Sequence, residues 1–329
     1  MSAYLIKRLI LMIPTVFLIS FMVFLAVHLV PGNIVDAIMA EQAQGGGGGA
    51  VDRAAIERAM GLDAPLLVQY GRWLGVTPQS DGKVSGFFQG SLGTSWWQSG
   101  SVLKLLGQAW PVTIELGILG LVVGLLIAIP IGIYSALRQD TWGDYLARSF
   151  AILCISVPGF WLGTMVIVFP AIWWNYMPSI RYIPFFEDPV GNLKMFIVPA
   201  IILGMVLSGV TMRMTRTVML EVLRQDYIRT AWSKGLKERV VVFRHALKNA
   251  LIPVITIVGF QVPVLIGGEV IIEQIFGLPG MGRLMINAVI QRDHPLICGI
   301  VLVFAVFLVL TNLLIDLTYA FLDPRITYR

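Results

Sequence analysis

Four carboxylates stand inside or beside long apolar stretches, where a charge is costly and is therefore a candidate for function. They are Glu115 in PVTIELG, Glu269 and Glu273 in GGEVIIEQIFGLPGMG, and Asp316 in NLLIDLTYA. Glu269 and Glu273 are four residues apart, so a helix would place them on one face. We predict that Glu269, Glu273 and Glu115 line a pathway and attract solutes that carry an amine. The alternative, that each carboxylate is hydrogen-bonded to a neighbouring helix, applies above all to Glu115, Glu273 and Asp316.

A basic segment from Gln225 to Pro253 is too regularly patterned to be a passive connector. Its apolar residues recur four apart, at Leu223, Tyr227 and Ala231 and again at Ile228 and Trp232. This spacing puts them on one face of a helix, and Gly235 follows where a helix C-terminus favours glycine. A second helix is expected from about Val240 into the next apolar stretch. A short amphipathic helix among basic side chains is typical of a docking element.

The elements that must position these residues are six apolar stretches. Hydrophobic residues make up 57% of the 329 residues and charged residues 13%, about half the charged share of an average soluble domain. About 20 apolar residues cross a bilayer as a helix. The predicted spans are Leu9–Val30, Val112–Leu137, Phe150–Trp173, Met195–Met212, Leu251–Ile272 and Ile297–Leu322. We therefore predict an all-α polytopic membrane protein.

The distribution of lysine and arginine predicts the orientation of the chain. With the N-terminus inside, the cytoplasmic loops and termini hold 15 of the 24 Lys and Arg residues, nine of them between Arg213 and Lys248. Both termini are therefore expected in the cytoplasm. The net charge of +5 follows from this bias and does not indicate nucleic-acid binding, because no nucleic-acid-binding motif accompanies it. The three histidines show no metal-ligand spacing.

Residues 31–110 form the one extramembrane piece large enough for a small subdomain. Two short amphipathic helices are expected in IERAMGLDAPLLVQYGRWLGV, and irregular structure in GFFQGSLGTSWWQSGSVLKLLGQAWPVT. The run Gly45–Gly49 is predicted to be a flexible tether and not a phosphate-binding loop, because no Lys-Ser or Lys-Thr follows it and no strand precedes it. No Walker-type loop occurs in the chain, so work driven by ATP would require an ATPase in another subunit.

The spacing of Ala231 and Gly235, followed by HAL at positions 245–247, resembles the EAA loop of ABC-importer permeases. The string DYIRTAWSKGL…RHALKNALIPV resembles the dipeptide/oligopeptide/nickel branch of that family. Thr230 and Lys248 depart from the general consensus in the way that is usual for this branch. The opening YLIKRLILMIPTVFLISFMVFLAVHLVPGN, the segment GLPGMGRL and the closing LDPRITYR resemble the B-type subunit. The resemblance therefore covers essentially the whole chain.

The resemblance implies a type I ABC-importer permease with six transmembrane helices. Its expected parts are a first helix at residues 1–30, an outer insertion at 31–110, and a core domain at 111–329 with five helices and a cytoplasmic coupling loop at about 213–250. The coupling helix is expected to seat in a groove of an ATPase subunit. The implied ATPase-coupling residues are Asp226, Tyr227, Arg229, Thr230, Ala231, Lys234 and Gly235. GLPGMGRL resembles an outer re-entrant segment, and the implied gate residues are Pro279, Gly280 and Arg283.

The function implied is import of peptides by alternating access, in the cytoplasmic (inner) membrane of a bacterium or archaeon. The expected partners are a homologous C-type permease, two ATPase subunits that bind ATP and Mg, an extracytoplasmic substrate-binding protein and the lipid bilayer, with no nucleic acid. The chain itself is not expected to be an enzyme. We expect it to have no catalytic residue and to bind no cofactor or metal.

Several alternatives stay open. The same architecture imports nickel chelates, glutathione, sugars or other solutes. A secondary transporter or channel would also have six spans, with broken helices or inverted repeats. A membrane-embedded enzyme would need a catalytic motif such as HExxH or GxSxG, which the sequence lacks.

Overall fold

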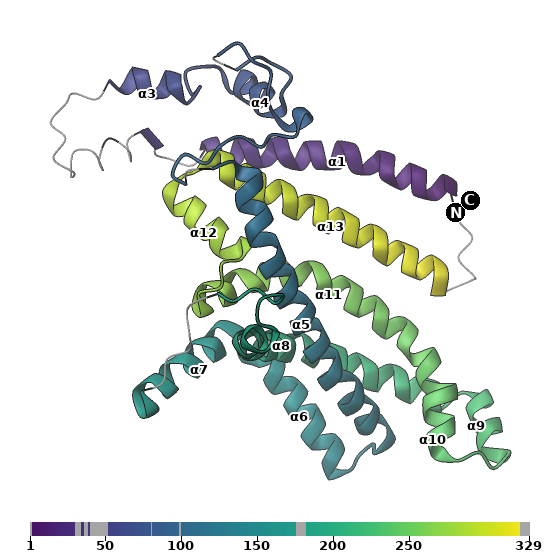
Figure 1. The fold of residues 1–329 in the computed structure, drawn as a ribbon. Coiled ribbons are helices and arrows are strands. Elements are labelled where there is room, and N and C mark those ends of the chain that lie inside the picture. The colour runs from purple at the N-terminus through teal and green to yellow at the C-terminus, as the bar shows by residue number, and fades with distance from the viewer. Residues whose placement is uncertain are drawn as a thin grey trace. The chain divides into compact units, whose positions relative to one another are not determined.

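The computed structural model of the chain describes residues 2–29, 34–35, 39, 52–79, 81–98, 100–175 and 182–322. Over these ranges the backbone is almost wholly helical, and the one isolated β-bridge pairs Thr94 with Ser101. Among the described residues, five helices are long and apolar enough to cross a membrane, and a bent pair of shorter helices makes a sixth span if it is taken as one. The predicted all-α polytopic membrane fold is confirmed (Figure 1).

The chain forms two compact units. Unit 1 comprises Met1–Pro111, Arg283–Val309 and Tyr328–Arg329, and unit 2 comprises Val112–Gly282 and Leu310–Thr327. The predicted glycine tether, residues 45–49, lies outside the described residues.

Unit 1 contains the first span and the described part of the outer piece. α1 (Ser2–Leu29) is an apolar helix with most of its surface exposed. α3 (Arg53–Ala59) begins after Asp52, whose carboxylate accepts the N–H of Ala54 and caps the helix. α3 and α4 (Leu66–Leu74) are the two short helices predicted for this segment. A short 3₁₀ turn and irregular backbone follow them, as expected for the described residues of 86–101. Residues 102–113, also predicted to be irregular, are instead the start of a long helix, because the run of apolar side chains in them continues into the second span.

Aromatic and polar contacts hold the outer piece to the helices of unit 1. Tyr70 of α4 packs its ring on Phe21 and Phe24 of α1, and its hydroxyl lies 2.8 Å from the hydroxyl of Ser20. Asp293, which is fully buried, accepts hydrogen bonds from the hydroxyl of Ser95 and from the N–H of Trp96. Within the described part of the outer piece, α4 and the segment around Ser95 are therefore both held to other elements of unit 1.

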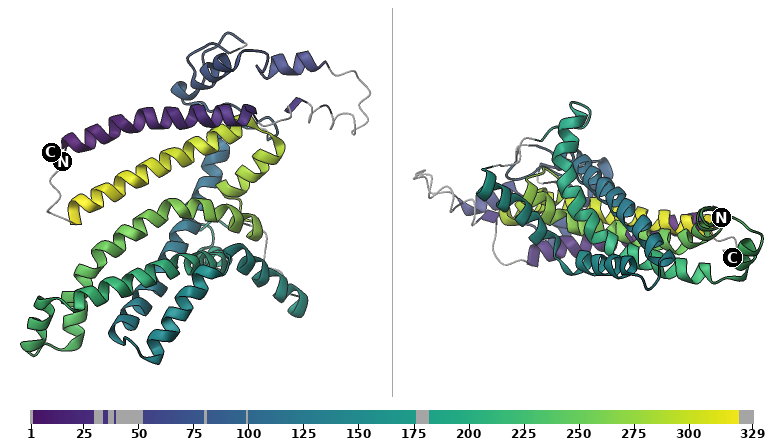
Figure 2. Two further views of the ribbon diagram at one scale, coloured as in Figure 1. Left: turned by 180° about the vertical axis from the view of Figure 1, so that it is seen from behind. Right: turned by 90° about the horizontal axis from the view of Figure 1, so that it is seen from below.

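Three long helices and a bent pair build unit 2. α8 (Pro189–Leu223) is the central helix. In its apolar stretch of 18 residues 61% are buried, whereas in that of α1 only 17% are buried. α5 (Val102–Leu137), which begins in unit 1, and α11 (Leu247–Phe276) lie against it (Figure 2). α5 and α8 cross closely, because Gly204 of α8 faces Gly120 of α5 with no side chain between them.

The third span differs from its prediction. We expected one helix over residues 150–173, whereas the structure has α6 (Trp142–Ser156) and α7 (Gly159–Trp174), bent by 90° with respect to each other. The break falls at Val157 and Pro158. Proline has no N–H to donate and pushes the residue before it to extended backbone, and Val157 has φ −86° and ψ 120°.

Two helices follow α11 in the described part of the chain. α12 (Met281–Gln291) begins within the predicted gate segment, and α13 (His294–Leu322) contains the predicted last span and passes from unit 1 into unit 2. Arg292, with φ 56°, turns the chain between them. Asp293 then begins α13, since its carboxylate accepts the N–H of Leu296.

Candidate functional site

The predicted docking helix exists and is anchored by one narrow apolar stripe. α9 spans Asp226–Ser233. Ile228 is fully buried and Ala231 is 7% exposed, in a core cluster that they share with α8 and with the start of the helix after α9. On the outer side Asp226 and Arg229 are exposed and lie 3.6 Å apart, an ion pair of little energetic weight. The stripe holds the helix in place while the rest of its surface stays accessible.

Gly235 ends this element in the manner predicted. Its φ is +74°, in the left-handed region that other residues rarely adopt. The N–H of Gly235 donates to the carbonyl of Trp232, and the N–H of Leu236 donates to that of Ala231, at 3.4 Å. This pair of bonds is a Schellman motif, which satisfies carbonyls at the helix end. A Cβ at Gly235 would meet no described atom within 4 Å, so the glycine is required by backbone conformation and not by space.

Tyr227 and Trp232 flank the buried stripe instead of joining it. Each of these side chains is 44% exposed. The Tyr227 hydroxyl accepts a hydrogen bond from the Asn249 amide at 2.9 Å, which ties α9 to α11. Thr230, also exposed, donates to the carbonyl of Asp226 in its own helix. Two half-exposed aromatic rings beside a fixed helix offer apolar area to a partner surface.

The chain after α9 returns to the membrane through an unusual helix. α10 (Glu238–Val240) continues through a π-helical turn, Val241–Ala246, into α11. The predicted helix from about Val240 is confirmed, but the π geometry had no signal in the sequence. The π-helical turn buries Val241, Val242 and Ala246 in the cluster that receives α9. Figures 1 and 2 show α9 and α10 beside each other.

Positive charge dominates the surface around α9. Seven basic residues in this region are exposed, against three acidic ones, Glu221, Asp226 and Glu238. The basic residues are Arg224, Arg229, Lys234, Lys237, Arg239, Arg244 and Lys248. Such a surface favours association with an acidic partner.

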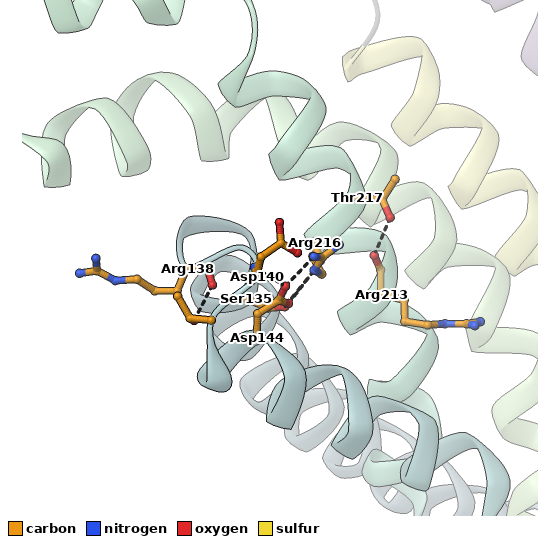
Figure 3. A network of polar contacts seen from close by, with 8 residues as sticks. Ser135, Arg138, Asp140, Asp144, Arg213, Arg216 and Thr217 are labelled. Carbon is orange, nitrogen blue, oxygen red and sulfur yellow. Dashed lines mark hydrogen bonds and ion pairs between the residues drawn. The ribbon is translucent and has the colours of Figure 1, made fainter.

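A buried ion-pair network lies close to this helix and was not predicted (Figure 3). Asp144, in the first turn of α6, is fully buried. Its two oxygens accept from Nε and Nη2 of Arg216 on α8, at 2.8 and 2.7 Å. The hydroxyl of Ser135 on α5 donates to the same carboxylate at 2.5 Å, and so does the N–H of Asp140 at 3.1 Å. The network therefore joins three helices.

Breaking this network is costly because the ion pair is buried. Removing one partner of a buried pair costs about 3–5 kcal/mol, since it leaves the other charge uncompensated. The side chain of Arg216 is 20% exposed, which puts the expected cost near the lower end of that range. Asp140, whose N–H donates to Asp144, has a φ of +60°, a left-handed conformation that aspartate tolerates better than most residues. Asp144 and Arg216 lie 72 positions apart, so no local pattern could have paired them.

A second polar cluster organises the predicted gate segment. Glu273 of α11 is fully buried. Its carboxylate accepts from the Thr113 hydroxyl at 2.5 Å and from the Gly282 N–H at 2.8 Å, and Thr113 in turn accepts from the N–H of Met281. These two N–H groups belong to the first turn of α12, so they have no acceptor within the helix, and negative charge is favourable at this end of a helix. A Cβ on Gly280 would collide with the Glu273 carboxylate, so the turn requires glycine.

Comparisons with known proteins identify the family. A family model described as the inner membrane component of binding-protein-dependent transport systems matches residues 128–328, and a model of the N-terminal part of such components matches residues 1–117. The chain belongs to this family. Members are membrane components of ABC transport systems and not ATPases themselves.

Full-length relatives of this inner membrane component carry transport names. A putative peptide transport system permease protein of Brucella abortus is 38% identical over all of both chains. A dipeptide transport system permease protein of Alkalihalophilus pseudofirmus is 36% identical, and a glutathione transport system permease protein of Salmonella paratyphi A is 33% identical, each over all of both chains.

The predicted pathway carboxylates of this inner membrane component have different surroundings. Both oxygens of Glu273 are engaged and none of its surface is accessible, which supports the structural alternative for this residue. Glu115 is partly buried in α5 and faces the amide of Asn192 on α8. Burial, followed by the nearby charges of Glu115 and Glu187, raises the pKa of the Tyr182 phenol. Glu269 lies in α11, and its side chain is outside the described part of the structure.

The predicted gate residues lie together around the start of α12. Pro279 is exposed, Gly280 is buried, and Arg283 is partly buried in the first turn of α12. Among the described residues no group of three or more His, Cys, Asp or Glu is arranged to hold a metal ion.

Proposed function

We propose that this chain is the transmembrane permease subunit of an ATP-driven importer of peptides. The observation that supports this is full-length similarity to permease proteins named for peptide and dipeptide transport. Alternating access of the helix bundle would carry the substrate inward. Import of glutathione, itself a short peptide, is the alternative, and the relative named for glutathione transport supports it with lower identity.

The proposed complex supplies what the chain lacks. Two ATPase subunits bind ATP and Mg, a homologous permease subunit completes the bundle, and an extracytoplasmic binding protein delivers substrate. Both termini and α9 lie in the cytoplasm, as the distribution of Lys and Arg favours. Residues 1–30 form the first span, 31–110 the outer insertion and 111–329 the core domain, with the coupling loop at about 213–250.

We assign the contact with an ATPase subunit to α9. Ile228 and Ala231 fix the helix through their buried side chains. Tyr227, Trp232 and the basic side chains remain exposed and available for contact with the ATPase. A partner groove with acidic walls and an apolar floor complements this surface. The rigid anchoring matters, because a partner can move a fixed helix as a lever, whereas a loose loop would absorb the displacement.

Three substitutions at Gly235 test this assignment in the complete importer. Gly235→Asn keeps the left-handed backbone at little cost, Gly235→Ala adds about 1–2 kcal/mol of backbone strain, and Gly235→Arg adds the same strain plus a long side chain. No described neighbour fills this space, so the extra effect of arginine must come from a partner.

The measurements are membrane insertion, ATP hydrolysis stimulated by the binding protein, and substrate uptake. We expect all three variants in the membrane, near-normal coupling for Asn, a mild loss for Ala, and loss of both activities for Arg. Normal coupling in Gly235→Arg would contradict the assignment of α9 to the ATPase interface. Equal losses for Ala and Arg would attribute the effect to strain alone.

A further inference from the structure

We propose that Arg216 and Asp144 are positioning residues for coupling, which lock the end of α8 to the α5–α6 hairpin so that a displacement of α9 moves these helices as one body. This inference rests on the proposed role of α9 as the ATPase contact. It goes further by naming the joint through which motion of that helix reaches the spans.

The connection from α9 to Arg216 is short. α8 ends at Leu223 and α9 begins at Asp226, so two residues separate them. The cluster that receives α9 includes Val218 and Met219 of α8, the second and third residues after Arg216. A force on α9 therefore acts on α8 within one turn of the ion pair.

The network is suited to transmit that force. Nε and Nη2 of Arg216 bind the two oxygens of Asp144 as a fork, which fixes orientation as well as distance. Nε also donates to the Ser135 hydroxyl at 3.1 Å, so α5 is held by the same guanidinium. Apolar contacts elsewhere along α8 are non-directional, so they fix relative orientation less well than the fork does. Separation at the ion pair would instead leave a buried charge without its partner, so the three helices stay together at this end.

Neighbouring arginines show that this pairing is particular to Arg216. Arg213, one turn earlier on α8, and Arg138, at the end of α5, are exposed and point away from Asp144 in Figure 3. Arg213 is therefore a matched control on the same helix. A purely structural ion pair would stabilise the fold without affecting how ATP hydrolysis is converted into transport.

The first experiment compares Arg216→Lys with Arg213→Lys in the complete importer in proteoliposomes. Lysine keeps the charge but cannot form the planar fork. For Arg216→Lys we expect stimulated ATP hydrolysis to persist while uptake per ATP hydrolysed falls about tenfold, within the range of known coupling effects. Arg213→Lys should leave both quantities unchanged. A normal ratio of uptake to hydrolysis in Arg216→Lys would overturn the proposal.

A rescue experiment separates positioning from folding. The double variant Asp144→Cys and Arg216→Cys removes both charges together, so no buried charge is left unpaired. It is made with Cys154 and Cys298, both free and buried, replaced by alanine. A short cleavable dithiol-reactive linker then bridges the two positions. We expect a low ratio of uptake to hydrolysis before bridging, recovery after it, and loss again on cleavage. Loss of both activities that bridging does not restore would also overturn the proposal.

A cross-link distinguishes failure of this joint from failure of the proposed function. Tyr227→Cys is made in the chain in which only Cys154 and Cys298 are replaced by alanine, and the complete importer is then treated with a thiol-to-amine reagent. A cross-link to an ATPase subunit supports the proposed docking role of α9, and its absence refutes that role. If the cross-link forms and Arg216→Lys still couples normally, only the joint is refuted.

Discussion

Single residues with the same chemistry have different roles in this permease because their neighbours differ. Glu273 has donors on both oxygens and lies where α12 begins, so its charge is used to hold a turn. Asp144 has four donor contacts and holds three helices. Glu269, on the same helix as Glu273, remains the predicted pathway residue. An apolar surrounding sequence marks Glu269 and Glu273 alike as candidates for function, but only the partners of each carboxylate separate a structural role from a pathway role.

Glu273 is predicted to matter for stability and not for substrate choice. In Glu273→Ala the N–H of Gly282 and the hydroxyl of Thr113 lose their acceptor while buried, at about 1–3 kcal/mol each. We expect a lower thermal midpoint in detergent and an equal loss of uptake for peptides with free and blocked N-termini. Glu273→Gln keeps one acceptor and should be milder. A loss confined to free-amine peptides would instead place Glu273 on the pathway.

Glu269 is predicted to show the opposite behaviour. If its carboxylate meets the substrate amine, Glu269→Gln should reduce uptake of peptides with a free N-terminus more than uptake of N-blocked ones, because the charge pair is lost only for the former. The thermal midpoint should stay close to that of the unmodified protein. Equal uptake losses for both peptide types would favour a structural role.

At the scale of elements, close helix crossings depend on glycines that look interchangeable in the sequence. A Cβ at Gly204 of α8 would lie 2.8 Å from the carbonyl oxygen of Gly120 and from the nitrogen of Gly124, both on α5. A Cβ at Gly107, also in a helix, would meet nothing within 4 Å. The two positions have the same intrinsic helix preference and differ only in packing.

This contrast gives a matched pair of substitutions. Gly204→Ala should destabilise by about 1–3 kcal/mol, because backbone atoms cannot move aside as a flexible side chain would. Gly107→Ala should be neutral or stabilise by up to about 1 kcal/mol through helix propensity. Thermal unfolding of both variants in the same detergent measures the difference. Equal midpoints would mean that α5 and α8 cross less closely than described.

At the scale of the whole molecule, the outer piece combines a predicted tether with a docked segment. Residues 45–49 lie outside the described structure, and their composition predicts flexibility. Trp97 donates its indole N–H to the carbonyl of Gln291, and Asp293 holds Ser95 and Trp96. The segment from Gly86 to Gly100 is therefore part of unit 1 and not a free loop.

Two changes in the outer piece should have opposite results. Replacing residues 45–49 by a Ser/Gly tether of equal length should leave uptake intact, because such a tether is equally flexible. Deleting residues 86–100 removes the contacts with Asp293 and Gln291 and should abolish either assembly or delivery of substrate. Co-purification with the partner subunits and uptake are the measurements. Loss of uptake with the tether and tolerance of the deletion would reverse the assignment.

Features that depend on short stretches of sequence were predictable, and features that depend on distant partners were not. The spans follow from runs of apolar residues, and Gly235 follows from the pattern of α9. The break at Pro158 had a visible cause, but a proline inside an apolar run does not by itself give a 90° bend. The pairing of Asp144 with Arg216 and the capping of α12 by Glu273 required knowledge of which helices meet. Those contacts are set by packing of the whole bundle.

The π-helical turn at Val241–Ala246 changes the rotational phase of α11 relative to α10. Such a turn holds one residue more than an α-helix of the same length, so everything after it is rotated relative to an uninterrupted helix by roughly 100°, the angle of one α-helical residue. The face of α11 that meets the bundle and the side chains at the start of the turn that receive α9 are therefore out of register by one residue. Loss of a single residue from this turn would leave the span the same length within about 1.5 Å, yet turn the docking surface to a different side of the molecule. The extra residue sets the direction in which the permease presents α9.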